Sequence, residues 1–237
     1  MPMSRRLHTP KEVRFANPRL KRVGIELLHL AELKGRVGER HLATPERAEF
    51  IMLLLVTDGS LRHTVDFVDV HLASGSLIYV HPGQVQHWHL ESPVQGCLVM
   101  IDPPALLDVV NRLDRRATLQ AAMEDWPVHV NLDDAFADDI KLDLYRLARD
   151  IKDYDKTEND VILIRQVLFT LMLRIARWHR NRSDDVPQSE VSSLNVYRLF
   201  RRELEQKFRE HWTISQYSQR LGFSKSTLNR ACHAAAG

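Results

Sequence analysis

The stretch LLLVTDGSLRHTVDFVDVHLASGSLIYVHPGQVQHW, from Leu53 to Trp88, decides the fold of the larger part of this chain. It consists of runs rich in β-branched and other apolar residues, which favour extended backbone. Short strands at this spacing predict an antiparallel sandwich or barrel between about Val23 and Ile101. The runs are broken by three turn-forming pairs: Asp58-Gly59, Ser74-Gly75 and Pro82-Gly83.

The pattern becomes helical after the pair Pro103-Pro104. Two helices are predicted in this part of the chain. The later one, over about residues 160–180, is apolar on more than one side, so another element or another chain must cover it. The earlier one, around residues 140–154, carries an apolar stripe that packs either on its own barrel or on a second copy of the chain. The stripe recurs at steps of four, three, four and three residues: Ile140, Leu144, Leu147, Ile151 and Tyr154.

The charges of the chain are segregated, although its formal net charge is only +2. From Asp102 to Asp160, fifteen acidic residues face eight basic ones, whereas from Leu194 to Gly237 eight basic residues face three acidic ones. The polar stretch NRSDDVPQSE, residues 181–190, separates these regions and indicates a domain boundary. The C-terminal end is therefore the part that we expect to face a polyanion.

The C-terminal region predicts three helices. The first begins near Ser192 or Ser193, and the second is capped by Thr213. A tight turn at Gly222 and an N-cap at Ser224 then start the third. Its exposed positions carry hydrogen-bonding groups that suit phosphates and base edges: Lys225, Ser226, Thr227, Asn229, Arg230 and His233.

The composition fits a protein with real hydrophobic cores, because 44% of its 237 residues are hydrophobic. No apolar run approaches the length of a membrane helix, and the basic N-terminus is followed by no apolar segment of a signal peptide. Cys97 and Cys232 lie far apart, so we expect two free thiols. We accordingly expect a cytoplasmic location and no membrane partner.

Two segments carry a family resemblance. The sequence HWTISQYSQRLGFSKSTLNRACHAAAG, residues 211–237, resembles the first helix-turn-helix of the AraC/XylS transcription regulators. The stretch quoted first resembles the cupin-type sensor domain that many of them carry in front of it. The resemblance implies an α+β protein with an N-terminal cupin-like β-barrel, a helical dimerisation segment and a small all-α helix-turn-helix subdomain. Its implied function is ligand-responsive, DNA-binding transcription control without enzymatic activity.

The resemblance also implies residue roles and boundaries. Ser226, Asn229 and Arg230 match the base-reading positions, and Lys225 and Thr227, after Ser224, lie nearer the phosphates. The resemblance implies a second helix-turn-helix after the first one. The given sequence ends at Gly237, before such a motif, so a truncated regulator is predicted. The predicted parts are an effector-sensing domain (1–103), a helical linker and dimerisation segment (104–181), a linker (182–191) and a partial AraC-type DNA-binding domain (192–237).

A cupin-like sensor is expected to hold a small effector inside its barrel, with no cofactor. The effector's chemical class is open. Expected partners are double-stranded promoter DNA, the effector, and RNA polymerase as a further candidate. We also expect a homodimer through Asp139–Tyr154 and the following helix. The predicted effector-lining residues are strand positions that alternate with polar ones: His63, Val65, Phe67, Tyr79, His81 and Trp88.

Two alternatives compete with this interpretation. His87 and His89 lie on one face of a strand, which suggests a metal-dependent cupin enzyme. However, Gln86 stands where the glycine-containing turn of metal cupins is followed by a ligand histidine, so we expect no metal. The second alternative is a partner protein that modulates a full-length regulator by forming mixed dimers.

Overall fold

The computed structural model describes residues 10–38, 42, 44–90, 93–106, 123, 126–183 and 188–236. The chain forms two compact units. We call them the barrel unit (Met1–Gln120 and Trp126–Arg174) and the helical unit (Ala121–Asp125 and Ile175–Gly237). The strands are β1 (Lys11–Val13), β2 (Ile25–His29), β3 (Glu46–Ala48), β4 (Ile51–Val65), β5 (Val68–Ala73), β6 (Ser76–Val80), β7 (Val85–His89), β8 (Val94–Ile101) and β9 (His129–Asn131). The helices are α1 (Leu30–Val37), α5 (Asp134–Lys152), α6 (Glu158–Ser183), α7 (Gln188–Lys207), η1 (Phe208–Glu210), α8 (Ile214–Leu221) and α9 (Lys225–Ala236).

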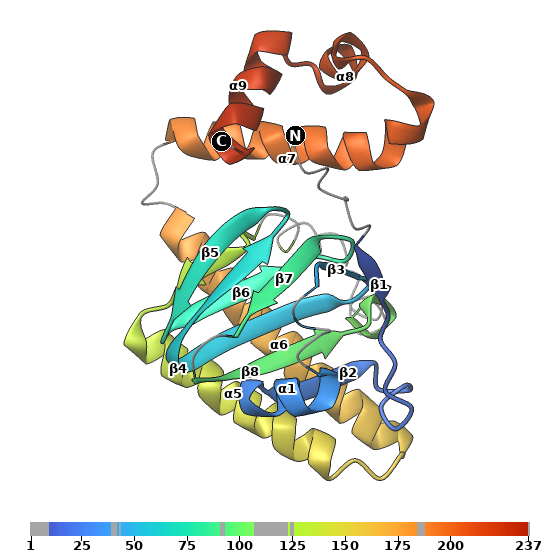
Figure 1. Ribbon diagram of the computed structural model, residues 1–237, viewed down its shortest axis with the longest axis vertical. Coiled ribbons are helices and arrows are strands. Elements are labelled where there is room, and N and C mark those ends of the chain that lie inside the picture. Colours follow the sequence, from blue (N-terminus) through green and yellow to red (C-terminus); the bar gives the residue numbers. More distant parts are fainter. Residues whose placement is uncertain are drawn as a thin grey trace, which may run out of the picture. The chain divides into compact units, whose positions relative to one another are not determined.

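The longest strand, β4, belongs to two sheets (Figure 1). Its first half, residues 51–59, pairs with β6 and β8, and its second half, residues 60–65, pairs with β5 and β7. The register shifts between Val56 and Asp58, and Gly59 has a φ of 76°. An irregularity of this kind bends a strand without ending it. The predicted turn at Asp58-Gly59 is therefore wrong, because the chain bends there within one strand.

The two sheets form a curled half-barrel of mostly antiparallel strands. Sheet A contains β1, β3, β7, the second half of β4, and β5, with β1 and β3 parallel. Sheet B contains β2, β8, the first half of β4, β6 and β9. The predicted turns at Ser74-Gly75 and Pro82-Gly83 are confirmed, since they separate β5 from β6 and β6 from β7.

A hairpin turn that the sequence did not reveal joins β4 to β5 at Asp66 and Phe67, which have φ angles of 46° and 69°. The Asp66 carboxylate accepts hydrogen bonds from the backbone N–H of Val85 at 3.0 Å and from Nε2 of Gln84 at 2.7 Å. These bonds fasten the turn to the start of β7. Phe67 is 84% exposed at the turn, so its predicted place inside the barrel is wrong.

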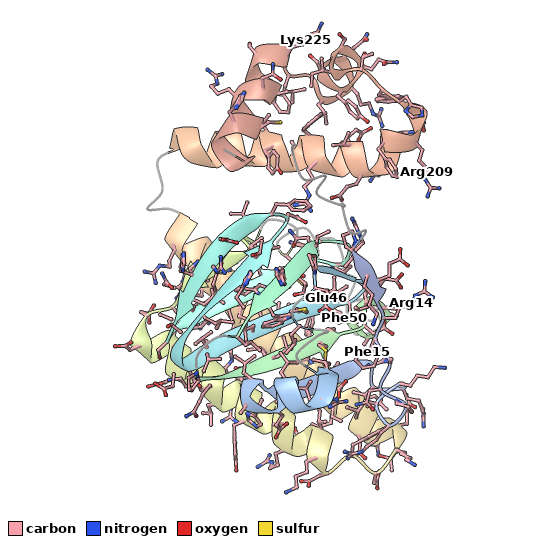
Figure 2. The ribbon with its side chains drawn as sticks, in the orientation of Figure 1. Arg14, Phe15, Glu46, Phe50, Arg209 and Lys225 are labelled. Carbon is pink, nitrogen blue, oxygen red and sulfur yellow. The ribbon has the colours of Figure 1, made fainter. Side chains whose placement is uncertain are left out.

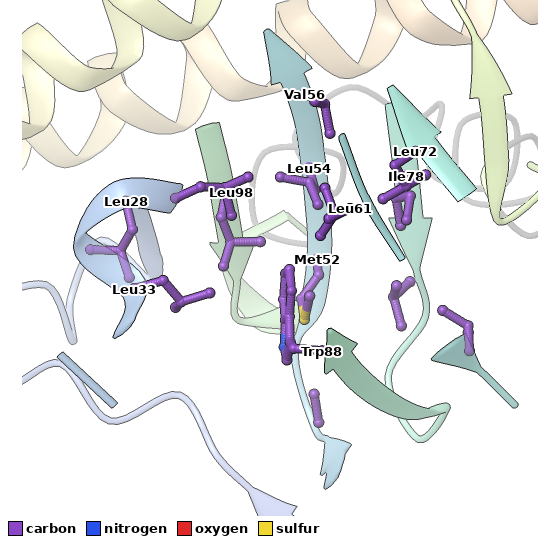
Figure 3. Packing of buried hydrophobic residues seen from close by; sticks show 14 of the residues in the cluster. Leu28, Leu33, Met52, Leu54, Val56, Leu61, Leu72, Ile78, Trp88 and Leu98 are labelled. Carbon is purple, nitrogen blue, oxygen red and sulfur yellow. The ribbon is translucent and has the colours of Figure 1, made fainter. Parts of the chain in front are cut away.

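The core of the barrel unit lies between the sheets (Figure 3). Alternate residues of both halves of β4 point into it, which follows from the two-residue period of a strand. Fully buried apolar side chains of this kind contribute about 1.5–3 kcal/mol each. The labelled members of the cluster are Leu28, Leu33, Met52, Leu54, Val56, Leu61, Leu72, Ile78, Trp88 and Leu98.

Helix α5 and the part of α6 up to Arg174 complete the barrel unit (Figure 1). Helix α5 packs against β2, and an ion pair of 3.3 Å between Asp143 and Arg174 joins α5 to α6. The predicted stripe of α5 is buried inside this unit, with exposed fractions of 0–7%, so its assignment to a homodimer contact is wrong. The stripe belongs to the packing of its own unit, since α5 lies against β2 of the same chain. Its members are Ile140, Leu144, Leu147, Ile151 and Tyr154.

The helical unit confirms the predicted capping residues. Thr213 is the N-cap of α8, and its backbone N–H donates to Oε1 of Gln216 at 2.7 Å. Gly222 ends α8 in the left-handed region, with a φ of 72°, which glycine adopts without strain. Oγ of Ser224 accepts a hydrogen bond of 3.1 Å from the backbone N–H of Thr227 and so caps α9.

Helix α7 begins at Gln188, which is earlier than the predicted start near Ser192 or Ser193. The predicted linker at 182–191 lies partly outside the described residues, and its described ends belong to α6 and α7. The core of the helical unit is small. Among the described residues, one cluster of buried side chains holds α7, α8 and α9 together: Val196, Tyr217, Leu228 and Ala231.

Candidate functional site

The interior of the barrel holds a group of polar side chains that strands β3, β4 and β7 position. In the register of sheet A, Glu46 lies opposite Gln86, and His63 lies opposite Trp88. All four side chains are at most 7% exposed. They point inward because each occupies the buried phase of its strand. We call Glu46, His63, Gln86 and Trp88 the interior site.

The interior site is joined by specific contacts. Nε2 of Gln86 lies 3.2 Å from Oε1 of Glu46 and 2.9 Å from Sδ of Met52. The ring of His63 packs on that of Trp88, with centroids 4.3 Å apart and planes tilted by 57°. Figure 2 labels Glu46, which comes from the short strand β3 at the side of the half-barrel. An indole, an imidazole, an amide and a carboxylate therefore meet within one buried region.

Hydrogen-bonding capacity remains unused in this site. Within the part of the chain that the structure describes, Nδ1 and Nε2 of His63 and Oε1 of Gln86 are buried and have no partner in hydrogen-bond geometry. A buried polar group without a partner costs about 1–3 kcal/mol. Because proteins satisfy almost all such groups, these atoms mark a place where a polar ligand is expected to bind.

Burial sets the charge of His63. Removal from water lowers the pKa of its imidazole from 6.5 to about 3, against the opposing effect of the nearby Gln86 side chain. The ring is therefore neutral at neutral pH. In that form one nitrogen donates and the other accepts a hydrogen bond. Together with the Gln86 oxygen, His63 can bind a ligand group that both donates and accepts, such as a hydroxyl or an amide.

The six predicted effector-lining residues separate into three places. His63, Val65 and Trp88 share the interior of sheet A. Tyr79 lies on the opposite face of β6 from the core residues Ile78 and Val80, and His81 directly follows the strand. The ring of Tyr79 packs edge-on against Trp126 at 5.0 Å and against His81 at 4.7 Å. The prediction of Tyr79 and His81 as interior residues is wrong because β6 is buried on both faces, so burial does not mark its inner side. Phe67 lies in the exposed turn, as described above.

Glu46 and Gln86 are the functional candidates that sequence reasoning missed. The sequence pattern singles out Gln86 only because it stands where metal cupins carry a ligand histidine. Its alternation with Gln84 and Trp88 is the one available signal that it faces the interior. Glu46 lies on a strand of three residues, which is too short to show an alternation. Among the described residues, no group of three or more His, Cys, Asp or Glu side chains is placed to hold a metal.

Helix α9 presents the second set of predicted site residues. Ser224, Lys225, Ser226, Asn229 and Arg230 are exposed, and Thr227 is half-buried. Leu228 and Ala231 alternate with them on the buried side. Ser224 Oγ lies 2.8 Å from the hydroxyls of Ser226 and of Thr227, so the hydroxyl groups at the start of α9 are held together. Lys225 lies at the start of this helix (Figure 2).

The matched family agrees with this architecture. The family model described as "AraC-like ligand binding domain" matches residues 36–165, which include β3 to β9 and α5. The chain belongs to this family. The interior site therefore lies inside an AraC-like ligand-binding domain.

Two further expectations from the sequence concern the cysteines and membrane helices. Both cysteines, Cys97 and Cys232, are free thiols. No helix among the described residues combines the length and the apolar character needed to span a membrane.

Solved structures resemble the chain only distantly. The AraC-like transcriptional activator CuxR has 13% sequence identity, with 90% of this chain and 68% of CuxR covered and a TM-score of 0.36. ToxT from Vibrio cholerae O395 has 9% identity, with 80% and 67% covered and a TM-score of 0.38. The Clostridium difficile EutQ protein has 21% identity over 24% of this chain, which spans 45% of EutQ, with a TM-score of 0.23. No curated protein matches the chain.

Proposed function

We propose that this chain is a ligand-responsive, DNA-binding transcription regulator of the AraC type. The observation that carries the proposal is the interior site, which places unsatisfied polar atoms inside a domain of the AraC-like ligand-binding family. The proposed effector is a small molecule with hydroxyl or amide groups. Such groups suit the neutral imidazole of His63 and the Oε1 atom of Gln86, and an apolar face would suit Trp88.

The DNA-binding part of the proposal rests on α9. Its exposed side carries Asn229 and Arg230, and these side chains can pair with adenine and guanine in two-bond geometry. Lys225 and the hydroxyls at the helix start suit phosphates. Effector and DNA binding must be coupled reciprocally, so each ligand changes the affinity for the other by the same factor.

The variant Arg230→Ala tests the DNA-reading role. We expect it to lose about 1–3 kcal/mol of discrimination between the correct and a scrambled site, because a bidentate contact to a base would be removed. The measurement is fluorescence anisotropy of the full chain on DNA from upstream of its own gene and on scrambled DNA, over a salt series. Lys225→Ala should weaken binding to both DNAs alike and reduce the salt slope by about one.

Arg209→Ala provides the matched control. Arg209 is an exposed arginine of the same unit, in η1, and Figure 2 shows it away from Lys225. Its removal should leave the ratio of the two affinities unchanged. Equal discrimination by wild type and Arg230→Ala would contradict the assignment of α9 as the reading helix.

We also propose a homodimer, formed by a different face of α5 from the buried stripe. Leu142 and Tyr145 are 48% and 67% exposed and lie three residues apart, hence on one side of the helix. Exposed apolar side chains of this size are typical of contact surfaces when they cluster. Sedimentation velocity at micromolar concentration should show a dimer for the wild type and a monomer for L142K/Y145K. Phe67→Lys changes an even more exposed apolar side chain elsewhere and should stay dimeric. A monomeric wild type would refute the proposal.

A further inference from the structure

The outer face of sheet A carries a second polar group, on the opposite side of the sheet from the interior site. Register places His71, Arg62 and His89 in one row across β5, β4 and β7, and Asp69, Thr64 and His87 in the next row. These six positions alternate with the buried residues of the same strands, so all of them face outward. We call these six residues the outer polar face.

The outer polar face is connected by hydrogen bonds. The Thr64 hydroxyl lies 2.6 Å from Oδ1 of Asp69 and 2.9 Å from Nε2 of His89. Arg62 lies 3.2 Å from Oδ2 of Asp69 and 3.3 Å from Nδ1 of His89. The hydroxyl of Thr64 lowers the pKa of Asp69, and Arg62 lowers it further, so this carboxylate is charged at neutral pH. The imidazoles of His87 and His89 lie 4.2 Å apart.

A cavity opens beside these side chains, with a volume of about 440 Å³. Arg62, His71 and His89, which form one complete row of the outer polar face, line it together with neighbouring residues of β4 and β5. Cavities of about 300–1,000 Å³ hold small molecules. The open side and the guanidinium of Arg62 distinguish this cavity from the interior site, which is buried and contains no arginine.

We propose that the outer polar face binds a small molecule through a phosphate group. The donors that line the cavity are the guanidinium of Arg62 and the imidazoles of His71 and His89. The single carboxylate of the outer polar face is Asp69, to which the Thr64 hydroxyl donates. A phosphate competes with Asp69 for the planar fork of Arg62, which suits bidentate binding of oxyanions. The titratable groups that face the site are Asp69 and His71 on β5 and His87 and His89 on β7.

The test is a titration of the full chain with inorganic phosphate, followed by the imidazole NMR resonances. At pH 6, the resonances of His71, His87 and His89 should move together along one saturable curve with a Kd below about 1 mM. The resonance of His29 on β2 is the internal control for non-specific ionic effects and should not move.

Two variants locate the site. Arg62→Gln and His71→Gln should each weaken phosphate binding, the first by about tenfold, because a charge-assisted bidentate contact is lost. Both residues are at the surface, so both variants should keep the wild-type thermal transition. Three results would overturn the proposal: unmoved resonances of His71, His87 and His89 at tens of millimolar phosphate, equal movement of His29, or unchanged affinity in both variants. Movement with short duplex DNA but not with phosphate would also refute a small-molecule site.

Discussion

Lowering the pH from 6.5 to about 4 should destabilise the barrel unit by on the order of 3 kcal/mol through His63 alone. The folded state holds this imidazole neutral, with a pKa of about 3, whereas the unfolded chain binds a proton near pH 6.5. Between these values the unfolded state binds more protons, so stability falls as the pH falls. The effect is complete below about pH 3 and absent above the unfolded pKa.

Chemical denaturation across this pH range, followed by the fluorescence of the buried Trp88, measures the effect. The variant His63→Leu has a similar volume and no titrating group, so its stability should fall less steeply with acid by the stated amount. His71→Gln removes an exposed histidine of the same sheet and should retain the wild-type slope. Identical pH dependence of wild type and His63→Leu would show that His63 is not buried in neutral form.

Replacing Leu228 by alanine should unfold the helical unit and leave the barrel unit folded. Leu228 has no exposed surface, and its core among the described residues contains only three other buried side chains: Val196, Tyr217 and Ala231. Truncation of a buried leucine costs about 2–5 kcal/mol, which is a large share of the stability of a small unit. Proposed DNA binding should be lost with it, whereas effector binding in the barrel should persist.

Hydrogen exchange followed by mass spectrometry resolves the two units. In Leu228→Ala, peptides of α8 and α9 should lose protection and peptides of β4 should keep it. Leu228→Met conserves volume and should cost less than about 1.5 kcal/mol, so protection should be retained. Asn229→Ala changes the exposed neighbour and should affect only DNA binding. Protected α8 and α9 peptides in Leu228→Ala would contradict the described core.

Local sequence signals predicted those features that depend on neighbouring residues. The turns at Gly75 and Gly83, the N-caps Thr213 and Ser224 and the left-handed Gly222 were all predicted correctly, because each requires a particular residue at one position. The buried side of α9, with Leu228 and Ala231, was also predicted correctly, because residues three and four positions apart lie on the same side of a helix. The α+β fold class and the family were predicted from the resemblance of two longer segments to the AraC/XylS regulators.

Tertiary structure decided which of two equivalent faces is the inner one. The strand pattern does not distinguish the inner face of β6 from the face that packs on Trp126, so Tyr79 and His81 were misplaced. The turn at Asp66 is held by contacts with β7, nearly twenty residues later, and no local signal announces them. The stripe of α5 would look the same whether it covered a sheet or a second chain.

The sequence by itself therefore determined the secondary-structure types and the caps of this protein, since backbone preferences and periodicity act over a few residues. Only the tertiary structure brought Glu46 to Gln86 and His63 to Trp88, and gathered three histidines beside Arg62. These groupings depend on the register between distant strands. Register is set by the packing of the whole core, which is a property of no single segment.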